Sequence, residues 1–132
     1  MMIYELNYKK LNKIIDLEAL KELKYLKYTS KGFMDLHVDF LRREKDGSYV
    51  ISMAHNYIQN GDVIPDPDME LKINPKFGVV EALTFQNSLT YSEAYIHKNG
   101  QILVNLPVKR SLNKFLATWL SNIRNQNYAR EK

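Results

Sequence analysis

The sequence has 132 residues, of which 45% are hydrophobic and 26% are charged. This composition is typical of a globular protein, and we expect residues 1–132 to form a single domain. The absence of cysteine excludes disulfides, thiolate metal ligands and cysteine nucleophiles. No apolar run is long enough for a membrane helix, and the first residues lack the apolar centre of a signal peptide, so we expect a cytoplasmic protein without membrane contact.

The net charge of +4 is unevenly distributed along the chain. Residues 1–93 contain 12 Lys/Arg and 14 Asp/Glu, whereas residues 94–132 contain 7 Lys/Arg and only Glu131 as an acidic residue. Such an asymmetry is typical of proteins that bind a polyanion. A basic helix that is simply solvated is the alternative explanation.

The first half of the chain changes from a helical to an alternating pattern. Residues 8–28 are predicted to form a helix, because their apolar residues lie mostly three or four apart and no Pro or Gly interrupts them. Residues 33–43 then alternate in polarity and predict a half-buried strand, followed by an Asp-Gly turn. Residues 49–58 predict a central return strand, because both of its faces carry apolar side chains.

The most constrained local sequence is the proline-containing stretch 59–71. Asn60 and Gly61 favour a turn, and Pro65 and Pro67 lack the N–H groups that a strand ladder uses. We therefore expect pairing to break at these prolines and a full strand to resume at Met69.

The second half of the chain predicts further short strands and a helix. Strands are expected at 79–86 and 90–97, and residues 102–106 suit either an edge strand or a linker. After Pro107, an amphipathic stripe predicts a buried helix face that includes Leu112, Phe115, Leu116, Trp119, Leu120 and Ile123. The fold class is therefore α+β, with an antiparallel β-meander of about five strands flanked by N- and C-terminal helices packed on one face.

Three short blocks carry a resemblance to known proteins. They are Gln-Asn-Gly-Asp with Asp-Pro-Asp-Met within residues 59–69, Ala-Leu-Thr-Phe-Gln-Asn at 82–87, and Leu-Asn-Lys-Phe-Leu-Ala-Thr-Trp-Leu at 112–120. With them, the chain resembles a family of small uncharacterised bacterial and mobile-element domains, similar in style to the YqiB-like proteins. The resemblance covers about residues 50–125 and implies an α+β fold, but it implies no activity and no catalytic residue.

An acidic turn is one candidate site. Asp62, Asp66, Asp68 and Glu70 lie within nine residues, and clustered carboxylates suit a hard cation. His55, on the preceding strand, is a candidate general base beside them. The spacing does not fit an EF-hand loop, and aspartates next to prolines are also ordinary turn residues. His55 follows an apolar series of alternate residues, which favours a hydrogen-bonded core histidine.

Motifs for chemistry are otherwise absent from the sequence. It contains no nucleophile motif, no zinc-ligand spacing and no glycine-rich phosphate loop, so no cofactor is expected. Tyrosines on the predicted strands suit base stacking, but packing within the sheet explains them as well. They are Tyr49, Tyr57, Tyr91 and Tyr95.

The leading hypothesis is a small binding or accessory module. Its basic C-terminal helix would contact an acidic protein or nucleic acid through Lys109, Arg110, Lys114, Arg124 and Arg130. The alternative is a metal-dependent or acid–base enzyme that uses Asp62, Asp66, Asp68 and Glu70. Self-association through a sheet edge is a third hypothesis, and the sequence does not fix the oligomeric state.

Overall fold

A computed structural model describes residues 2–132 of the chain. The described helices are α1 (Ile3–Ile14), α2 (Leu17–Leu23) and α3 (Leu106–Asn125). The first strands are β1 (Tyr25–Thr29), β2 (Leu36–Arg43), β3 (Tyr49–Gln59), β4 (Asp62–Asn74) and β5 (Val79–Ala82). They are followed by β6 (Thr84–Gln86), β7 (Tyr91–Glu93), β8 (Tyr95–Lys98), β9 (Gln101–Val104) and, after α3, β10 (Ala129–Arg130).

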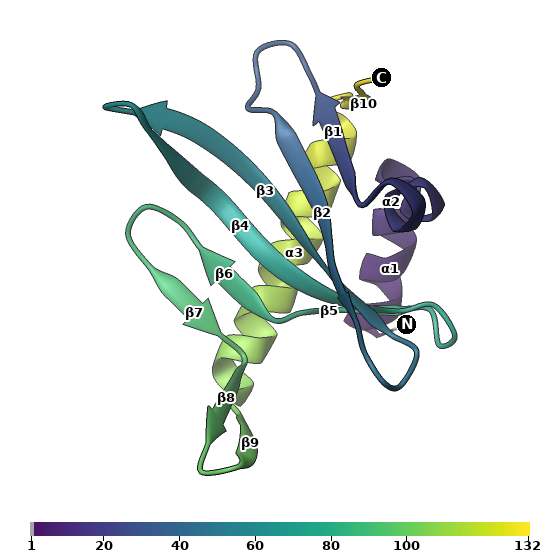
Figure 1. The fold of residues 1–132 in the computed structure, drawn as a ribbon, viewed down its shortest axis with the longest axis vertical. Helices are drawn as coiled ribbons and strands as arrows, with labels where there is room; N and C mark the ends of the chain where they lie inside the picture. Colours follow the sequence, from purple (N-terminus) through teal and green to yellow (C-terminus); the bar gives the residue numbers. More distant parts are fainter. Residues whose placement is uncertain (1) are drawn as a thin grey trace.

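The strands form one large antiparallel sheet and one separate hairpin. The large sheet has the order β10-β1-β2-β3-β4-β6-β7, with β5 also paired to β4. β8 pairs only with β9. In Figure 1 α3 crosses behind the sheet, α1 and α2 lie beside it, and the β8–β9 hairpin extends from one end of the molecule.

The core lies between the sheet and the helices. Alternate residues of the sheet, such as Val38, Met53 and Met69, are fully buried and stand in register on neighbouring strands. α3 buries the predicted stripe except Phe115, and only 5% of Trp119 is exposed. The predicted α+β class with terminal helices on one face of an antiparallel sheet is therefore confirmed. Within residues 2–132, no helix combines the length and apolarity needed to cross a membrane.

The predicted single helix over residues 8–28 is wrong. The chain leaves the helical conformation at Ile15, begins α2 with Asp16 as its N-cap, and ends α2 at Lys24, which has a φ of 71°. Tyr25–Thr29 then forms β1 at the side of β2. Leu26 is therefore buried from a strand. In β1 every second residue is buried, and the position of Leu26 also fits the spacing of a helix, so the sequence pattern did not distinguish the two.

The predicted break in pairing at the prolines is confirmed only as a local register shift between Pro65 and Asp68, and the strand itself continues through this segment. β4 pairs with β3 on both sides of this segment, and Pro65 stands opposite Asn56 beside a register shift. β6 joins the other edge of β4 only at Asp68. Residues 62–67 thus form an edge segment, where a residue without an N–H group is tolerated.

The later strands are shorter than predicted. The predicted strands 79–86 and 90–97 are each divided, at Leu83 and Ala94, into β5 and β6 and into β7 and β8. Residues 101–104 form β9, so the edge-strand alternative for this segment is the correct one.

Candidate binding surfaces

The outer side of the helix layer is strongly basic. α1 and α3 together contain seven basic residues and one acidic residue, Glu5. Arg110, Lys114, Ser121 and Arg124 lie on one side of α3, because their spacing returns to the same face of a 3.6-residue helix. Lys10 of α1 donates from Nζ to the hydroxyl of Ser121 at 2.9 Å, so the lysines of α1 border this stripe. We call Lys9, Lys10, Lys13, Arg110, Lys114 and Arg124 the basic helix face.

A groove of about 310 Å³ lies between α1 and α3 on the basic helix face. Four of its eight lining residues are basic and none is acidic: Leu6, Lys9, Lys10, Lys13, Leu120, Ser121, Arg124 and Asn125. Among residues 2–132, no ion pair involves any residue of the basic helix face. Because these charges are not neutralised within the chain, they produce a positive potential toward solvent.

Lys109 does not belong to this face, although the sequence placed it there. Its side chain is only 23% exposed and pairs with Glu81 at 3.3 Å. It also donates to the hydroxyl of Tyr95 at 2.9 Å, and that hydroxyl donates to Glu81. The hydrogen bond with Tyr95 and the charge of Glu81 raise the pKa of Lys109 against the opposing effect of burial. The Glu81–Tyr95–Lys109 network joins β5, β8 and α3.

The opposite face of the sheet carries the acidic residues. β4, β5, β6 and β7 contain six acidic residues and one lysine, Lys72. On β2, β3 and β4, Asp39, Ser52 and Glu70 stand in register, and Asp68 lies in the neighbouring row. We call Asp39, Asp68 and Glu70 the open sheet face. Burial raises the pKa of Asp39, and burial followed by the charges of Glu70 and Asp39 raises the pKa of Asp68.

The four predicted acids do not converge on one site. Asp68 and Glu70 point to the open sheet face, while Asp62 is exposed at the start of β4, opposite Gln59. Asp66 is exposed in the proline segment. The structure instead brings Asp39 toward Asp68 and Glu70, a neighbour that sequence spacing could not reveal. No group of three or more His, Cys, Asp or Glu within residues 2–132 is placed to hold a metal ion.

His55 lies on the other side of β3, inside the core. Its ring stands 5.4 Å from that of Trp119 and 5.7 Å from that of Tyr128, measured between centroids. Nδ1 lies 3.2 Å from the carbonyl oxygen of Asp35. Burial lowers the pKa of His55, which favours the neutral ring. His55 is a packed core histidine, separated by the sheet from Asp68 and Glu70.

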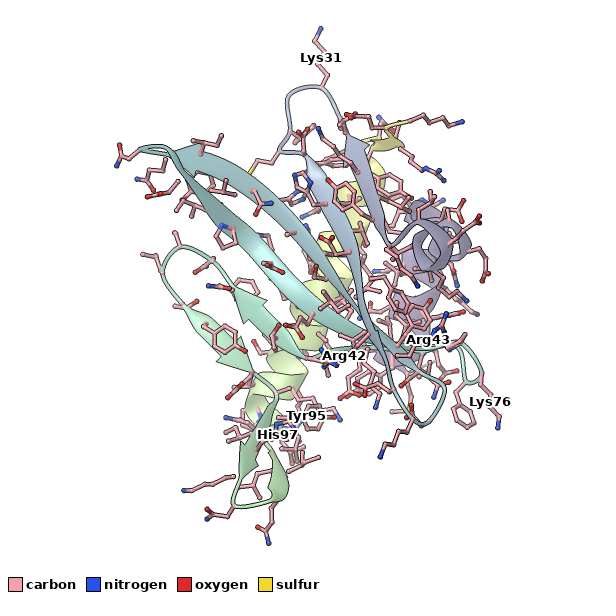
Figure 2. The ribbon with its side chains drawn as sticks, in the orientation of Figure 1. Lys31, Arg42, Arg43, Lys76, Tyr95 and His97 are labelled. Carbon is pink, nitrogen blue, oxygen red and sulfur yellow. The ribbon has the colours of Figure 1, made fainter. Side chains whose placement is uncertain are left out.

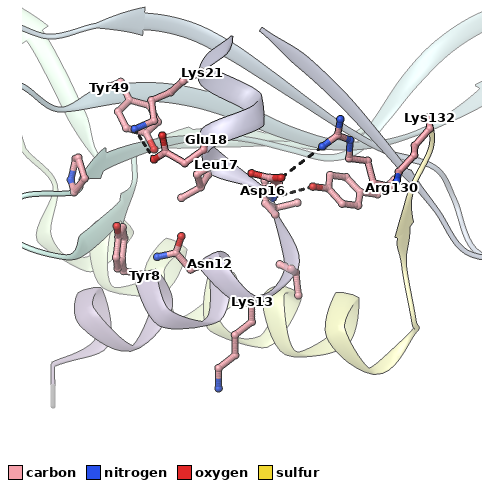
Figure 3. A pocket seen from close by; sticks show the side chains of 14 residues that line it. Tyr8, Asn12, Lys13, Asp16, Leu17, Glu18, Lys21, Tyr49, Arg130 and Lys132 are labelled. Atoms are coloured by element: carbon pink, nitrogen blue, oxygen red, sulfur yellow. Dashed lines mark hydrogen bonds and ion pairs between the residues drawn. The ribbon is translucent and has the colours of Figure 1, made fainter. Parts of the chain in front are cut away.

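A larger cavity lies where α1, α2, β3 and the C-terminal residues meet (Figure 3). It has a volume of about 600 Å³. Its charges are largely paired: Arg130 lies 3.5 Å from Asp16, and Lys21 lies 3.0 Å from Glu18. Arg130, which the sequence grouped with the basic helix, is therefore held at this cavity. Burial is the main cause that raises the pKa of Tyr49, on its wall, to about 12.

A second cavity, of about 570 Å³, lies between the sheet and the β8–β9 hairpin. It is lined on the sheet side by Arg42, Glu70 and Lys72 and on the hairpin side by Tyr95 and His97. Figure 2 shows Arg42 on the sheet, and Tyr95 and His97 on the hairpin. Arg42 pairs with Glu44 at 3.3 Å and with Glu70 at 3.7 Å, and the lining as a whole contains more glutamates than basic residues.

Comparison with known proteins assigns the chain to a family. The profile of a family described as a domain of unknown function, DUF6908, matches residues 7–129. The chain belongs to this family. This confirms the prediction of an uncharacterised family, and it names no activity. Neither the curated proteins nor the solved structures yielded a match.

Proposed function

We propose that this member of the DUF6908 family is a small binding or accessory module that contacts an acidic partner through its basic helix face. The observation that carries the proposal is the set of six unpaired lysines and arginines on α1 and α3, beside a groove without an acidic residue. Arg42 and Lys72 of the sheet pair with acidic neighbours, whereas the cations of the basic helix face lie together on two packed helices with no acidic partner within residues 2–132. Such a surface steers and holds a polyanion.

Nucleic acid is the partner that this surface fits best. The cations extend along α3 from Arg110 to Arg124, a distance of about 20 Å at the helical rise per residue. The polar neighbours on the two helices include Asn12, Ser121 and Asn125, which are residue types that commonly donate to phosphate oxygens. An extended row of lysines and arginines with such neighbours suits a repeated phosphate backbone better than one compact acidic patch.

Origin and location complete the proposal. The resemblance to bacterial and mobile-element domains supports a role beside nucleic acid. The location that goes with this proposal is the cytoplasm, where nucleic acid is accessible. The absence of converging carboxylates at Asp62, Asp66, Asp68 and Glu70 supports binding over metal-dependent chemistry.

The test is binding of a fluorescently labelled DNA duplex, measured by anisotropy over a salt series. We expect binding at low salt and an affinity that falls steeply as salt rises, because neutralised phosphates release counterions. The double variant Lys114→Glu/Arg124→Glu should weaken binding at least about tenfold and flatten the salt dependence by about one unit of slope for each lost contact.

The matched control is Lys31→Glu/Lys76→Glu. Both lysines are exposed in loops, neither belongs to the basic helix face, and their side chains point outward in Figure 2; this variant changes the net charge by the same amount. It should retain most of the affinity. Equal losses in both double variants would reduce the effect to net charge, and an absence of binding at low salt would refute the nucleic-acid partner. If the chain bound a polyglutamate peptide in a salt-sensitive way but did not bind DNA, the partner would be an acidic protein and not a nucleic acid.

A further inference from the structure

The β8–β9 hairpin is structurally separate from the large sheet. Its two strands pair only with each other, closed by Asn99 and Gly100 at positive φ of 51° and 74°. Figure 1 shows the hairpin projecting beyond the body of the molecule. A two-stranded hairpin gains little stability by itself, so its exposed edges call for an explanation.

The outer strand of this hairpin is apolar and exposed. All four residues of β9 are exposed, including Ile102 at 66%, Leu103 at 46% and Val104 at 45%. No charged residue occurs from Asn99 to Leu106. Edge strands in monomeric proteins usually carry a lysine, a proline or a bulge that prevents pairing, and β9 has none of these.

The backbone of β9 leaves defined groups free. Asn105 donates to the carbonyl of Ala94 at 2.8 Å, which makes these two residues a hydrogen-bonded pair of the hairpin ladder. Hydrogen-bonded and non-hydrogen-bonded pairs alternate in an antiparallel ladder. Leu103 lies two residues before Asn105, so its N–H and C=O groups also point toward β8, to its partner Ile96. The N–H and C=O groups of Ile102 and Val104 therefore point outward, away from β8.

We propose that a second copy of this chain pairs with this edge, β9 against β9, around a two-fold axis at Leu103. Antiparallel pairing in this register brings the outward groups of Ile102 opposite those of Val104 of the second copy, and the reverse, which forms four backbone hydrogen bonds. The two Leu103 side chains then meet at the axis as a non-hydrogen-bonded pair, where side chains are closest.

The side chains are self-complementary in this register. On one side of the resulting four-stranded sheet, Ile96 and Leu103 of both copies form one aliphatic row, because these residues are paired in each hairpin. On the other side, Ile102 stands beside Val104 of the second copy. Lys98, the hairpin's only lysine or arginine, lies at its tip, away from the axis. A short aliphatic segment that matches itself when reversed indicates a second copy rather than an unrelated partner.

The first measurement is the molar mass of the full chain in solution, by light scattering or sedimentation over a micromolar concentration series. We expect a concentration-dependent mass approaching twice that of the 15.5 kDa chain. The variant Leu103→Lys should be monomeric, because two charges would meet at the axis. Leu89→Lys is the matched control, since Leu89 is 89% exposed in the β6–β7 turn, and it should remain dimeric.

Cross-linking tests the register directly. The chain lacks cysteine, so Leu103→Cys introduces a single thiol. At the proposed axis the two thiols lie within disulfide distance, and mild oxidation should give a covalent dimer rapidly. Leu89→Cys should not cross-link at a comparable rate. A monomeric mass throughout, or a dimer that persists in Leu103→Lys with native circular dichroism, would overturn the proposal without affecting the nucleic-acid test.

Discussion

The two outer surfaces of this molecule differ in whether their basic side chains form ion pairs. On the open sheet face and its surroundings, Arg42 pairs with Glu44 and Glu70, and Lys72 pairs with Asp46 at 3.5 Å. On the basic helix face, Lys9, Lys13 and their neighbours form no ion pair within the described residues. Arg42 and Lys72 on the sheet surface are thus paired with acids, whereas the cations of the helix surface have no acidic partner within the described residues.

This difference shows where function is to be sought. Internally paired surface charges contribute little to stability and little to long-range attraction. Six unpaired cations on one face repel each other modestly, and apart from Lys10, which donates to Ser121 and to the carbonyl of Ala117, none of these side chains makes a hydrogen bond within the described residues. The separation of charge between two faces is therefore the observation on which the proposed binding surface rests.

The largest expected effect is a loss of stability of the core that supports both faces. Trp119 lies between α3 and the sheet and contacts the rings of His55 and Phe115. Trp119→Ala should lower the free energy of unfolding by about 3–5 kcal/mol, through lost burial and the cavity left behind. Chemical denaturation followed by circular dichroism measures this, and a loss below about 1 kcal/mol would contradict the packing described.

The sequence predicted α3 and the central strands well, because their signals are regular. The stripe from Leu112 to Ile123 has only one environment that buries it, against the sheet. β1 could not be distinguished from helix by the same reasoning, since Leu26 satisfies both periodicities. The helix ends before β1 because Lys24 has a positive φ. The sequence does not predict this conformation, because lysine rarely adopts a positive φ.

The candidate surfaces were predictable only in part. The charge asymmetry identified Arg110, Lys114 and Arg124 correctly as exposed cations. It could not show that Lys9, Lys10 and Lys13 of α1 lie beside them, since that depends on how two helices pack. It also could not show that Lys109 turns inward, because its partners Glu81 and Tyr95 come from two different strands.

The second expected effect separates an internal cation from an external one. Lys109→Ala should destabilise the protein by about 1–3 kcal/mol, because Glu81 and Tyr95 lose a charged partner in a largely buried network. DNA binding of the folded variant should not change. Lys114→Ala should show the reverse, with stability within about 0.5 kcal/mol of the parent and weaker binding. Thermal melts and anisotropy titrations on the same samples distinguish the two residues, and weaker binding by Lys109→Ala would place it on the binding surface.

The third expected effect compares two arginines on opposite faces. Arg110→Gln should weaken DNA binding several-fold and reduce the salt slope by about one. Arg42→Gln, the same change on the sheet side, should leave both quantities unchanged, because Arg42 is held by Glu44 and Glu70. Anisotropy titrations at three or more salt concentrations measure both slopes. Equal slopes in the two variants would mean that the two faces contribute alike.

The smallest expected effect concerns the charge of Asp68 on the open sheet face. Burial, then the charges of Glu70 and Asp39, raise its pKa above the usual 3.8, so the folded protein binds this proton more tightly than the unfolded chain. The resulting stabilisation is present below the unfolded pKa and is lost as pH rises through the folded pKa. Asp68→Asn should therefore raise the melting temperature slightly at pH 7 and have little effect near pH 3.

Asp62→Asn is the control for that measurement, because Asp62 is exposed at the start of β4 and should give no gain at either pH. If Asp68→Asn lowered the melting temperature at neutral pH, the carboxylate would be stabilised by its surroundings rather than opposed by them. The open sheet face would then be a surface that holds negative charge favourably. The contrast with the basic helix face would become one between two charged binding surfaces, instead of one between a face whose carboxyl groups oppose one another's ionisation and a face of unpaired cations.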